Sequence, residues 1–232
     1  MGNQKVAAII QARMGSTRFP GKVLKPLAGK PVIWHIVYRL RKCQTVDIIA
    51  IATSVKSFDD PLEEFCREQK IPCVRGSEDN VLDRYNQAAE ELEADIIVRV
   101  TGDAPLVDPE IIDDLVINIK KYGVDYCSIS LEPPSIHEGF GVFTTSTLQR
   151  LSLIAEHDPV AREHITPYLR SHPELFSHKF IPIKPEHIIQ DSHVSVDTQE
   201  DLNRLEKIYS RTGARPGDID SKDVVEILLT GI

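Results

Sequence analysis

Residues 5–24 read KVAAIIQARMGSTRFPGKVL, an apolar run that passes directly into a loop of cations and small residues. The run at 5–10 has the length and composition of a buried strand. The loop then brings Arg13, Arg18 and Lys22 within a short distance along the chain. Two guanidinium forks and one ammonium group suit the several oxygens of a triphosphate, so we interpret the loop as a phosphate-binding loop. A solvated basic loop is the alternative.

The loop differs from the common nucleotide-binding motifs, because it contains neither GxxxxGK[ST] nor GxGxxG. Its glycines allow close approach of the backbone to a ligand, and Ser16 adds a hydroxyl group. We predict that Gln11 and Ala12, where the strand passes into the loop, bind substrate together with Arg13, Ser16, Arg18 and Lys22, and that Arg13 and Lys22 are also catalytic.

The first half of the chain alternates between strand and helix patterns. Alternation of this kind predicts βαβ units, and hence an α/β fold in which helices cover both faces of a mainly parallel sheet. Ligands of such folds bind at the carboxyl ends of the strands. The expected strands are 5–10, 46–53, 72–76, 94–100 and 124–130, and the expected helices are 31–43, 60–69, 79–93 and 108–123.

The pattern is less regular after residue 130. We expect a helix at 158–176 that is interrupted near Pro167, strands at 177–183 and 193–198, and helices at 198–213 and 221–231. We predict a single domain over residues 1–232. The region 131–185 is the expected place for substrate specificity or subunit contact.

Composition excludes several classes of protein. A formal net charge of −8 disfavours a nucleic-acid partner, because duplex binding rests on a basic face. No apolar run approaches the ~18 residues of a membrane span, and the first residues lack the pattern of a secretory signal. We therefore expect a cytoplasmic protein with no membrane partner. The four cysteines are scattered, which is typical of reduced thiols.

Two carboxylates follow expected strands and are candidate metal ligands. Thr101 and Gly102 end the strand that begins at 94, and Asp103 follows at once, at the same sheet edge as the cationic loop. A carboxylate close to a polyphosphate is repulsive unless a hard cation lies between them, so Asp103 indicates Mg²⁺ and a catalytic role; a turn residue is the alternative. Asp197 is the second candidate ligand, since Thr198 is the more natural helix cap. We interpret Asp108, which precedes a proline, as a helix cap.

Five segments in chain order resemble a known family. They are IIQARMGSTRFPGKVL (9–24), RGSEDNVLDRYNQAA (75–89), TGDAPLVDPEIID (101–113), REHITPYL (162–169) and VDTQEDL (196–202). The chain resembles the sugar-acid cytidylyltransferases, which include CMP-Kdo synthetases and acylneuraminate cytidylyltransferases. The resemblance is strongest to the branch of spore-coat polysaccharide biosynthesis proteins.

The resemblance implies a Rossmann-like three-layer α/β/α fold of the nucleotide-diphospho-sugar transferase type, with a mixed, mainly parallel sheet. It implies transfer of CMP from CTP to an acidic sugar with release of pyrophosphate, Mg²⁺ held by Asp103 and Asp197, and a homodimer. It also makes Ser77 and Arg84 candidate contacts to base or ribose, with a turn and a solvated helix face as the respective alternatives.

One departure from the branch concerns the sugar. The branch usually has two acidic residues where this chain has Gly141 and Phe143. The identity of the sugar is therefore open. Two further hypotheses stand beside the first: a nucleotidyltransferase that uses another nucleotide or a sugar-phosphate acceptor, and a nucleotide-binding relative without catalysis.

Overall fold

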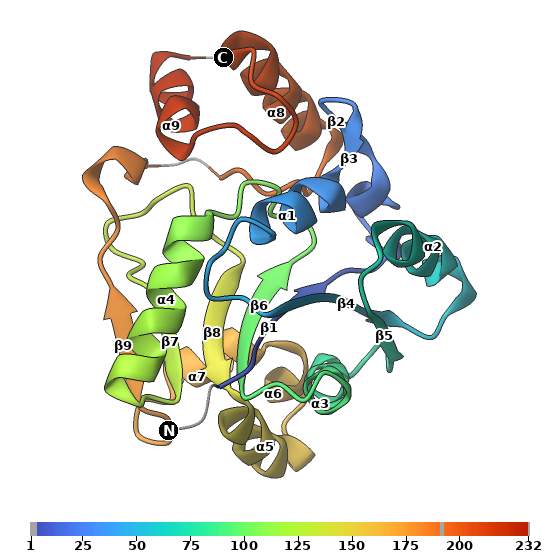
Figure 1. Ribbon diagram of the computed structural model, residues 1–232, viewed down its shortest axis with the longest axis vertical. Helices are drawn as coiled ribbons and strands as arrows, with labels where there is room; N and C mark the ends of the chain where they lie inside the picture. Colours follow the sequence, from blue (N-terminus) through green and yellow to red (C-terminus); the bar gives the residue numbers. More distant parts are fainter. Residues whose placement is uncertain (1–3, 191–192, 232) are drawn as a thin grey trace.

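A seven-stranded mixed sheet forms the centre of the computed structural model, which describes residues 4–190 and 193–231 (Figure 1). The strand order is β5-β4-β1-β6-β8-β7-β9, and all neighbours pair in parallel except that β8 is antiparallel to β6 and β7. The strands are β1 Val6–Gln11, β4 Ile48–Ser54, β5 Cys73–Gly76, β6 Ile96–Thr101, β7 Tyr126–Ile129, β8 Phe140–Thr144 and β9 His178–Ile181.

Strand β1 is buried on both faces because its side chains alternate between two hydrophobic clusters. Val6, Ala8 and Ile10 pack into one cluster, whereas Ala7 and Ile9 pack into the other. A continuous apolar run is the sequence that such a doubly covered strand requires. Strand β1 pairs with β4 on one side and with β6 on the other, and its carboxyl end lies at one edge of the sheet.

Helices cover both faces of the sheet, which gives the expected Rossmann-like three-layer arrangement (Figure 1). One layer contains α1 Val32–Leu40, α2 Asp60–Gln69 and α4 Pro109–Tyr122. The opposite layer contains α3 Val81–Glu91, α5 Thr145–Ile154, α6 Pro159–Glu163 and α7 Ile165–Ser171. Each helix turns an apolar stripe toward the strands, so burial of apolar surface holds the layers together.

A third hydrophobic cluster lies beside the sheet and its two helical layers. The last two helices, α8 Gln199–Thr212 and α9 Ser221–Thr230, pack there with the short hairpin β2 Pro26–Leu27 and β3 Lys30–Pro31. The cluster brings the C-terminal part of the chain next to the loop that follows β1 (Figure 1). Residues far apart in sequence thus meet at one edge of the sheet.

Two expectations for the second half of the chain are wrong. The helix at 158–176 is interrupted at His164, not near Pro167, because Pro167 lies in the first turn of α7, where its missing N–H costs no hydrogen bond. The expected strand at 193–198 is irregular in the structure. Its backbone bonds to Asp103, through the N–H of Val196, and to the Glu138 side chain instead of to a neighbouring strand.

The region 131–185 is more regular than its sequence suggests. It contains β8, α5, α6, α7 and β9, so most of it belongs to the sheet and to the helical layer. Among the described residues, no helix is long and apolar enough to cross a membrane.

Candidate active site

The loop after β1 is fixed by a buried carboxylate. Asp59, at the end of the short helix η2 Ser57–Asp59, is fully buried, and its Oδ1 accepts a 2.6 Å hydrogen bond from the backbone N–H of Met14. Its Oδ2 accepts from the N–H of Ser54 at 3.2 Å and from the Ser54 hydroxyl. The Met14 carbonyl in turn accepts from the N–H groups of Ser16 and Gly21. The loop is therefore pre-organised before any ligand binds.

The loops after β1 and β6 are in close contact. The N–H of Gly102 donates to the Gln11 carbonyl at 2.8 Å, and a Cβ at Gly102 would lie 2.8 Å from the Cβ of Ala12. Glycine is required at 102 because the space for a side chain is already filled. This contact puts Asp103 beside the cationic loop, as the sequence predicted.

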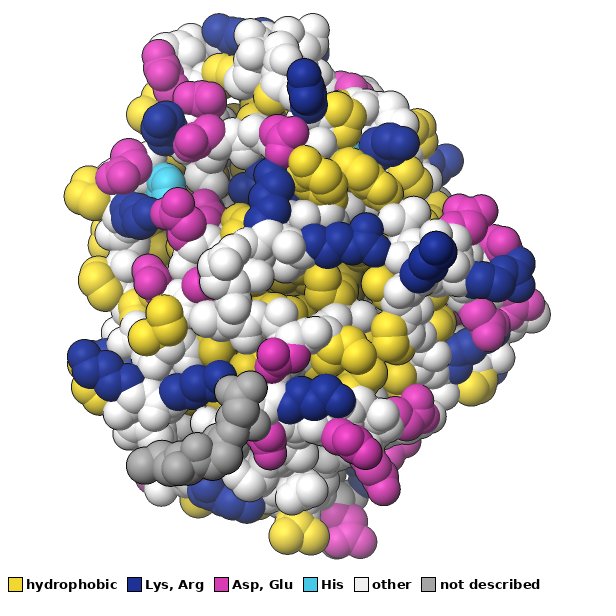
Figure 2. Space-filling model, viewed as in Figure 1, with side chains coloured by type: hydrophobic (Ala, Val, Ile, Leu, Met, Phe, Trp, Pro, Cys, Tyr) yellow, Lys and Arg dark blue, Asp and Glu magenta, His cyan; other side chains and the backbone are white. Residues whose placement is uncertain are grey.

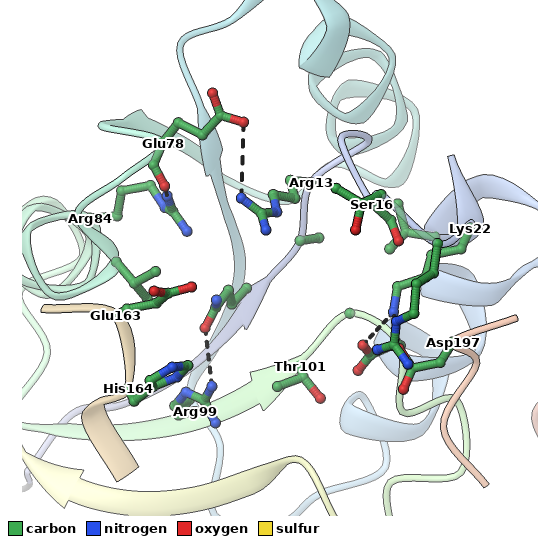
Figure 3. Close-up of a pocket in the computed structure, with 18 of the residues that line it drawn as sticks. Arg13, Ser16, Lys22, Glu78, Arg84, Arg99, Thr101, Glu163, His164 and Asp197 are labelled. Atoms are coloured by element: carbon green, nitrogen blue, oxygen red, sulfur yellow. Dashed lines mark hydrogen bonds and ion pairs between the residues drawn. The ribbon is translucent and has the colours of Figure 1, made fainter. Parts of the chain in front are cut away.

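A cavity of about 420 Å³ opens at this edge of the sheet (Figure 3). It has the size of a small-molecule site. Nine of the ten residues that the sequence nominated for the site line it: Gln11, Ala12, Arg13, Ser16, Arg18, Lys22, Arg84, Asp103 and Asp197. The other lining residues are Thr17, Val23, Glu78, Asp79, Val81, Arg99, Thr101, Gly102, Glu163 and His164.

Lys22 joins the two acidic candidates. Its Nζ lies 2.7 Å from Asp103 Oδ2 and 2.8 Å from Asp197 Oδ1, and Arg18 approaches the same Asp197 oxygen at 3.0 Å. The Lys22 side chain is 11% exposed, whereas the two carboxylates are 26% and 27% exposed. Both carboxylates are thus partly accessible, and both contact the Lys22 ammonium group on the cavity wall (Figure 3).

The electrostatics of this cluster favour an ionised Asp197. Burial by itself raises the pKa of Asp197, but the hydrogen bond from Lys22 and the charges of Lys22 and Arg18 outweigh burial. The pKa of Asp197 consequently lies below its ordinary value, and the group is charged at neutral pH. A charged oxygen ligand is what a hard cation such as Mg²⁺ prefers.

Two further guanidinium groups lie on the cavity wall near Glu78. Arg13 is 3.9 Å from Glu78 Oε1, which is a weak ion pair at half exposure. Arg84 is buried and donates to the carbonyl oxygens of Ser77 and Glu78. Burial lowers the pKa of Arg84. The solvated helix face considered for Arg84 is therefore wrong, since its side chain points into the protein.

The structure does not bring Ser77 to the cavity. The Ser77 hydroxyl accepts a hydrogen bond from the N–H of Asn80 at 3.2 Å, just before α3 begins. It is a turn residue that helps to start the helix, so no observation supports a direct contact between its side chain and a ligand.

Sequence reasoning missed Arg99, which projects from the middle of β6 into the cavity (Figure 3). It donates to Gln11 Oε1 at 3.2 Å and to the Thr166 hydroxyl at 3.3 Å. Its Nε is buried and has no hydrogen-bond partner among the described residues. The signal that could have found it is a lone arginine in the otherwise apolar strand IIVRVT, because arginine is seldom buried without a partner.

Glu163 and His164 approach the same side of the cavity from the junction of α6 and α7 (Figure 3). The segment REHITPYL therefore contributes side chains to the site. The place of His164 on the cavity wall is compatible with a contact to an acceptor.

The two positions that depart from the spore-coat branch have different environments. Gly141 pairs with Arg99 in the β6–β8 register, and a Cβ there would lie 2.9 Å from the Tyr126 ring. Phe143 is fully buried and packs against Tyr85 at 6.3 Å between ring centroids. Phe143, where the branch has an acid, thus fills the core. Gly141, where the branch has the other acid, is paired with Arg99 across the two strands, so the Arg99 guanidinium has no acid at this paired position.

Two helix caps are confirmed. Asp108 accepts from the N–H groups of Glu110 and Ile111 at the start of α4. Thr198 and Asp201 form a capping box at the start of α8. Because Thr198 caps the helix, the Asp197 side chain is available to the cavity.

Comparison with protein families gives a match that spans most of the chain. Residues 7–214 match the family described as cytidylyltransferase. The spore coat polysaccharide biosynthesis protein SpsF of Bacillus subtilis is 36% identical over 224 residues, which cover 95% of this chain and 92% of that protein. A 3-deoxy-manno-octulosonate cytidylyltransferase of Geobacter metallireducens is 36% identical over 112 residues, 48% of this chain and 43% of that enzyme.

Solved structures agree with these sequence relationships. A cytidylyltransferase from Leptospira borgpetersenii superposes with a TM-score of 0.89 at 29% identity, over 98% of this chain and 94% of that chain. A CMP:2-keto-3-deoxy-manno-octonic acid synthetase, solved in complex with CTP, has the same fold with a TM-score of 0.71 at 19% identity, over 90% and 99% of the two chains. The resemblance seen in the five sequence segments is thereby confirmed, and the chain belongs to the cytidylyltransferase family.

Proposed function

We propose that this protein transfers CMP from CTP to an acidic sugar and releases pyrophosphate. The observation that carries the proposal is the position of Lys22 between Asp103 and Asp197, with Arg13 and Arg18 on the same cavity wall. Cations that can hold a triphosphate and carboxylates that can hold a divalent metal then lie in one site. The relationship to SpsF supports a product used in surface polysaccharide biosynthesis.

In the proposed reaction a sugar hydroxyl oxygen attacks the α-phosphorus of CTP. The bond from that phosphorus to the bridging β-oxygen breaks, pyrophosphate leaves, and the hydroxyl proton passes to solvent. The developing charge on the phosphate oxygens is met by Arg13, Arg18 and Lys22, and Lys22 is held in place by its two carboxylate partners before the reaction begins. Positioning of the two substrates in one cavity supplies a further part of the rate.

The residues present fit a magnesium ion. Asp103 and Asp197 already converge on one cation, the Lys22 ammonium group, and both carboxylates reach the cavity. Mg²⁺ bound by this pair would neutralise charge on the triphosphate. Lys22 would remain close enough to bind a phosphate oxygen.

An acidic acceptor is supported by the guanidinium groups on the side of the cavity away from Lys22 (Figure 3). Arg99 and Arg84 line this part, and the Nε of each is buried without a partner among the described residues. A carboxylate is the ligand that such donors favour, because hydrogen bonds between ions are about twice as strong as neutral ones. The region near Arg99, Glu163 and His164 is therefore our proposed place for the sugar.

Calorimetry tests the nucleotide half of the proposal. CTP, UTP, ATP and GTP are titrated into the protein with and without Mg²⁺, and into the Asp103→Asn variant. We expect preferential CTP binding that depends on both Mg²⁺ and Asp103. Preference for another nucleotide would support the alternative nucleotidyltransferase, and absence of binding to all four would contradict the proposal.

Release of pyrophosphate tests the transfer step. With CTP and Mg²⁺ present, a panel of sugar acids such as Kdo and sialic acid is compared with sugar phosphates. We expect turnover with a sugar acid, and no turnover in Asp103→Asn. Tight CTP binding without turnover on any acceptor would favour the non-catalytic relative.

We also propose a homodimer that uses the region 131–185. Several large apolar side chains of this region are exposed, which is compatible with a subunit contact. Light scattering after size-exclusion chromatography would give the mass directly. A monomer at micromolar concentration would contradict this proposal. The exposed side chains concerned are Leu131, Leu153, Ile154, Val160, Leu175 and Phe180.

A further inference from the structure

A second group of potential metal ligands lies outside the cavity described above. Asp108, His137 and His187 each offer one ligand atom, and these atoms all lie within 4.8 Å of one another. All three residues are buried, with exposed fractions of 9%, 6% and 5%. They belong to three separate parts of the chain: the start of α4, the segment between β7 and β8, and η4 Pro185–His187.

The two imidazole rings face each other. His137 Nε2 and His187 Nδ1 are 2.9 Å apart, and the rings are close to perpendicular, at 68°. Two nitrogen ligands of a tetrahedral zinc ion, each at about 2.0–2.1 Å from the metal, are roughly 3.3 Å apart. The distance between the two nitrogens is therefore within a few tenths of an ångström of the distance between two ligands of one ion.

Asp108 retains capacity for a further contact. Its Oδ1 accepts the two helix-capping N–H groups, and its Oδ2 accepts one hydrogen bond, from the Ser221 hydroxyl at 2.8 Å. A carboxylate has about four lone-pair positions, so one on Oδ2 is left. The nearby Arg39 guanidinium donates to the carbonyl oxygens of Val107, Gly217 and Ile219 instead.

The cluster has access to solvent through a cavity of about 490 Å³. Asp108 and His187 line this cavity, and charged side chains of both signs surround it. Figure 2 shows Lys, Arg, Asp and Glu side chains intermixed in the area between α4 and α9. An ion could enter there, and water could complete its coordination.

We propose that Asp108, His137 and His187 bind a borderline divalent cation such as Zn²⁺. Imidazole nitrogen favours Zn²⁺ over Mg²⁺, so this site differs in chemistry from the all-carboxylate pair in the cavity. Binding replaces the hydrogen bond between the rings. The proton that the rings share moves to the other nitrogen of its own imidazole, which leaves one nitrogen of each ring free to bind the ion.

The ion would have a structural role. His137 lies two residues before Gly139, whose carbonyl accepts a 2.8 Å hydrogen bond from the N–H of Thr101 on the catalytic edge. Between them, Glu138 accepts from the N–H groups of Val194 and Ser195, which hold the segment that carries Asp197. A cation at the histidine pair would therefore stabilise the frame around the first site without touching substrate.

Cobalt absorption tests the proposal directly. The full, tag-free chain is freed of metal with a chelator and titrated with Co²⁺ in excess Mg²⁺. We expect visible bands that saturate at one equivalent and disappear when Zn²⁺ is added, and a higher melting temperature with Zn²⁺. The absence of saturable Co²⁺ binding by the folded wild-type chain would overturn the proposal and leave a hydrogen-bonded histidine pair in the core.

Substitution of each proposed ligand tests whether these three side chains bind the ion. His137→Gln and His187→Gln retain a hydrogen-bonding side chain, and Asp108→Asn retains a good helix cap. Each should weaken Co²⁺ binding by at least about tenfold, since changes even to the groups supporting a ligand have that effect. His172→Gln is the matched histidine control and Asp103→Asn controls for the cavity; both should bind Co²⁺ as the wild type does. Binding unchanged in all three cluster variants would contradict the assignment.

Discussion

The buried carboxylate of Asp59 accepts the backbone N–H of Met14 at 2.6 Å, and this bond sets the course of the cationic loop. Asp59→Asn replaces one acceptor oxygen by an NH₂ group that faces an N–H donor. We expect a loss of about 1–3 kcal/mol in the free energy of unfolding and about tenfold weaker CTP binding. Denaturant unfolding and calorimetry measure the two effects. The neighbouring exposed Asp60→Asn is the control, and equal effects of both variants would contradict the anchoring role.

Removal of the Lys22 ammonium group should affect catalysis more than folding. Lys22→Met leaves two carboxylates facing each other and removes a cation that meets charge on the phosphates. We expect kcat to fall by about 10²–10³, measured as pyrophosphate release. Lys25→Met changes an exposed lysine three residues away and should retain activity. Near-normal kcat in Lys22→Met would show that Lys22 only pairs with Asp103 and Asp197.

Arg99 should control affinity for the acceptor if the acceptor is acidic. Arg99→Gln removes one charge beside the proposed sugar region, so we expect KM for the sugar acid to rise by about 10–100-fold while KM for CTP changes little. Steady-state kinetics with each substrate varied in turn separate the two constants. The exposed Arg67→Gln serves as a control. An equal rise in both KM values would point to a general structural role.

Gly139 is constrained by both its backbone and its surroundings. It has φ +76°, and a Cβ would lie 2.3 Å from the hydroxyl oxygen of Thr101, which precedes Asp103 by two residues. Gly139→Ala should cost more than the ~1 kcal/mol expected from backbone strain alone. Gly123→Ala isolates that strain, because Gly123 has φ +60° with nothing within 4 Å of the added Cβ. Equal unfolding free energies for the two variants would disprove the steric argument.

Asp125 should make stability depend on pH. Burial raises its pKa, but the hydrogen bonds from Ser177 and the charge of Arg150 outweigh burial, so the pKa lies below its ordinary value of 3.8. The folded state therefore gains stability from the ionised group above about pH 4, and loses it as pH falls through the lowered pKa. Asp125→Asn should be less stable by about 1–2 kcal/mol at pH 7.

The difference between wild type and Asp125→Asn should shrink as the pH falls below 4. Urea unfolding at a series of pH values measures it, with the exposed Asp114→Asn as the control. A difference that stays constant down to pH 2 would show that the hydrogen bonds do not depend on ionisation.

The sequence by itself determined the features that depend on neighbouring residues. The apolar run at 5–10 was predicted as a buried strand and the structure has one at Val6–Gln11, and the helix at 60–69 was predicted with the bounds that the structure has. The cap at Asp108 and the capping box at Thr198 follow from side chains that reach N–H groups two or three residues away. Because the carboxyl ends of parallel strands share one edge, the loop after β1 and Asp103 were also expected together.

Only the tertiary structure decided the contacts between distant segments. Lys22 and Asp197 are 175 residues apart in sequence, and no local pattern specifies their 2.8 Å contact. The segment 193–198 alternates like a strand, yet its backbone bonds to Asp103 and Glu138, because packing of α8 and α9 places it beside the loop and not beside a strand. The position of Arg99 in the site also depends on tertiary structure. Its strand was predictable from the sequence, but the cavity that its side chain lines forms only when distant segments pack together.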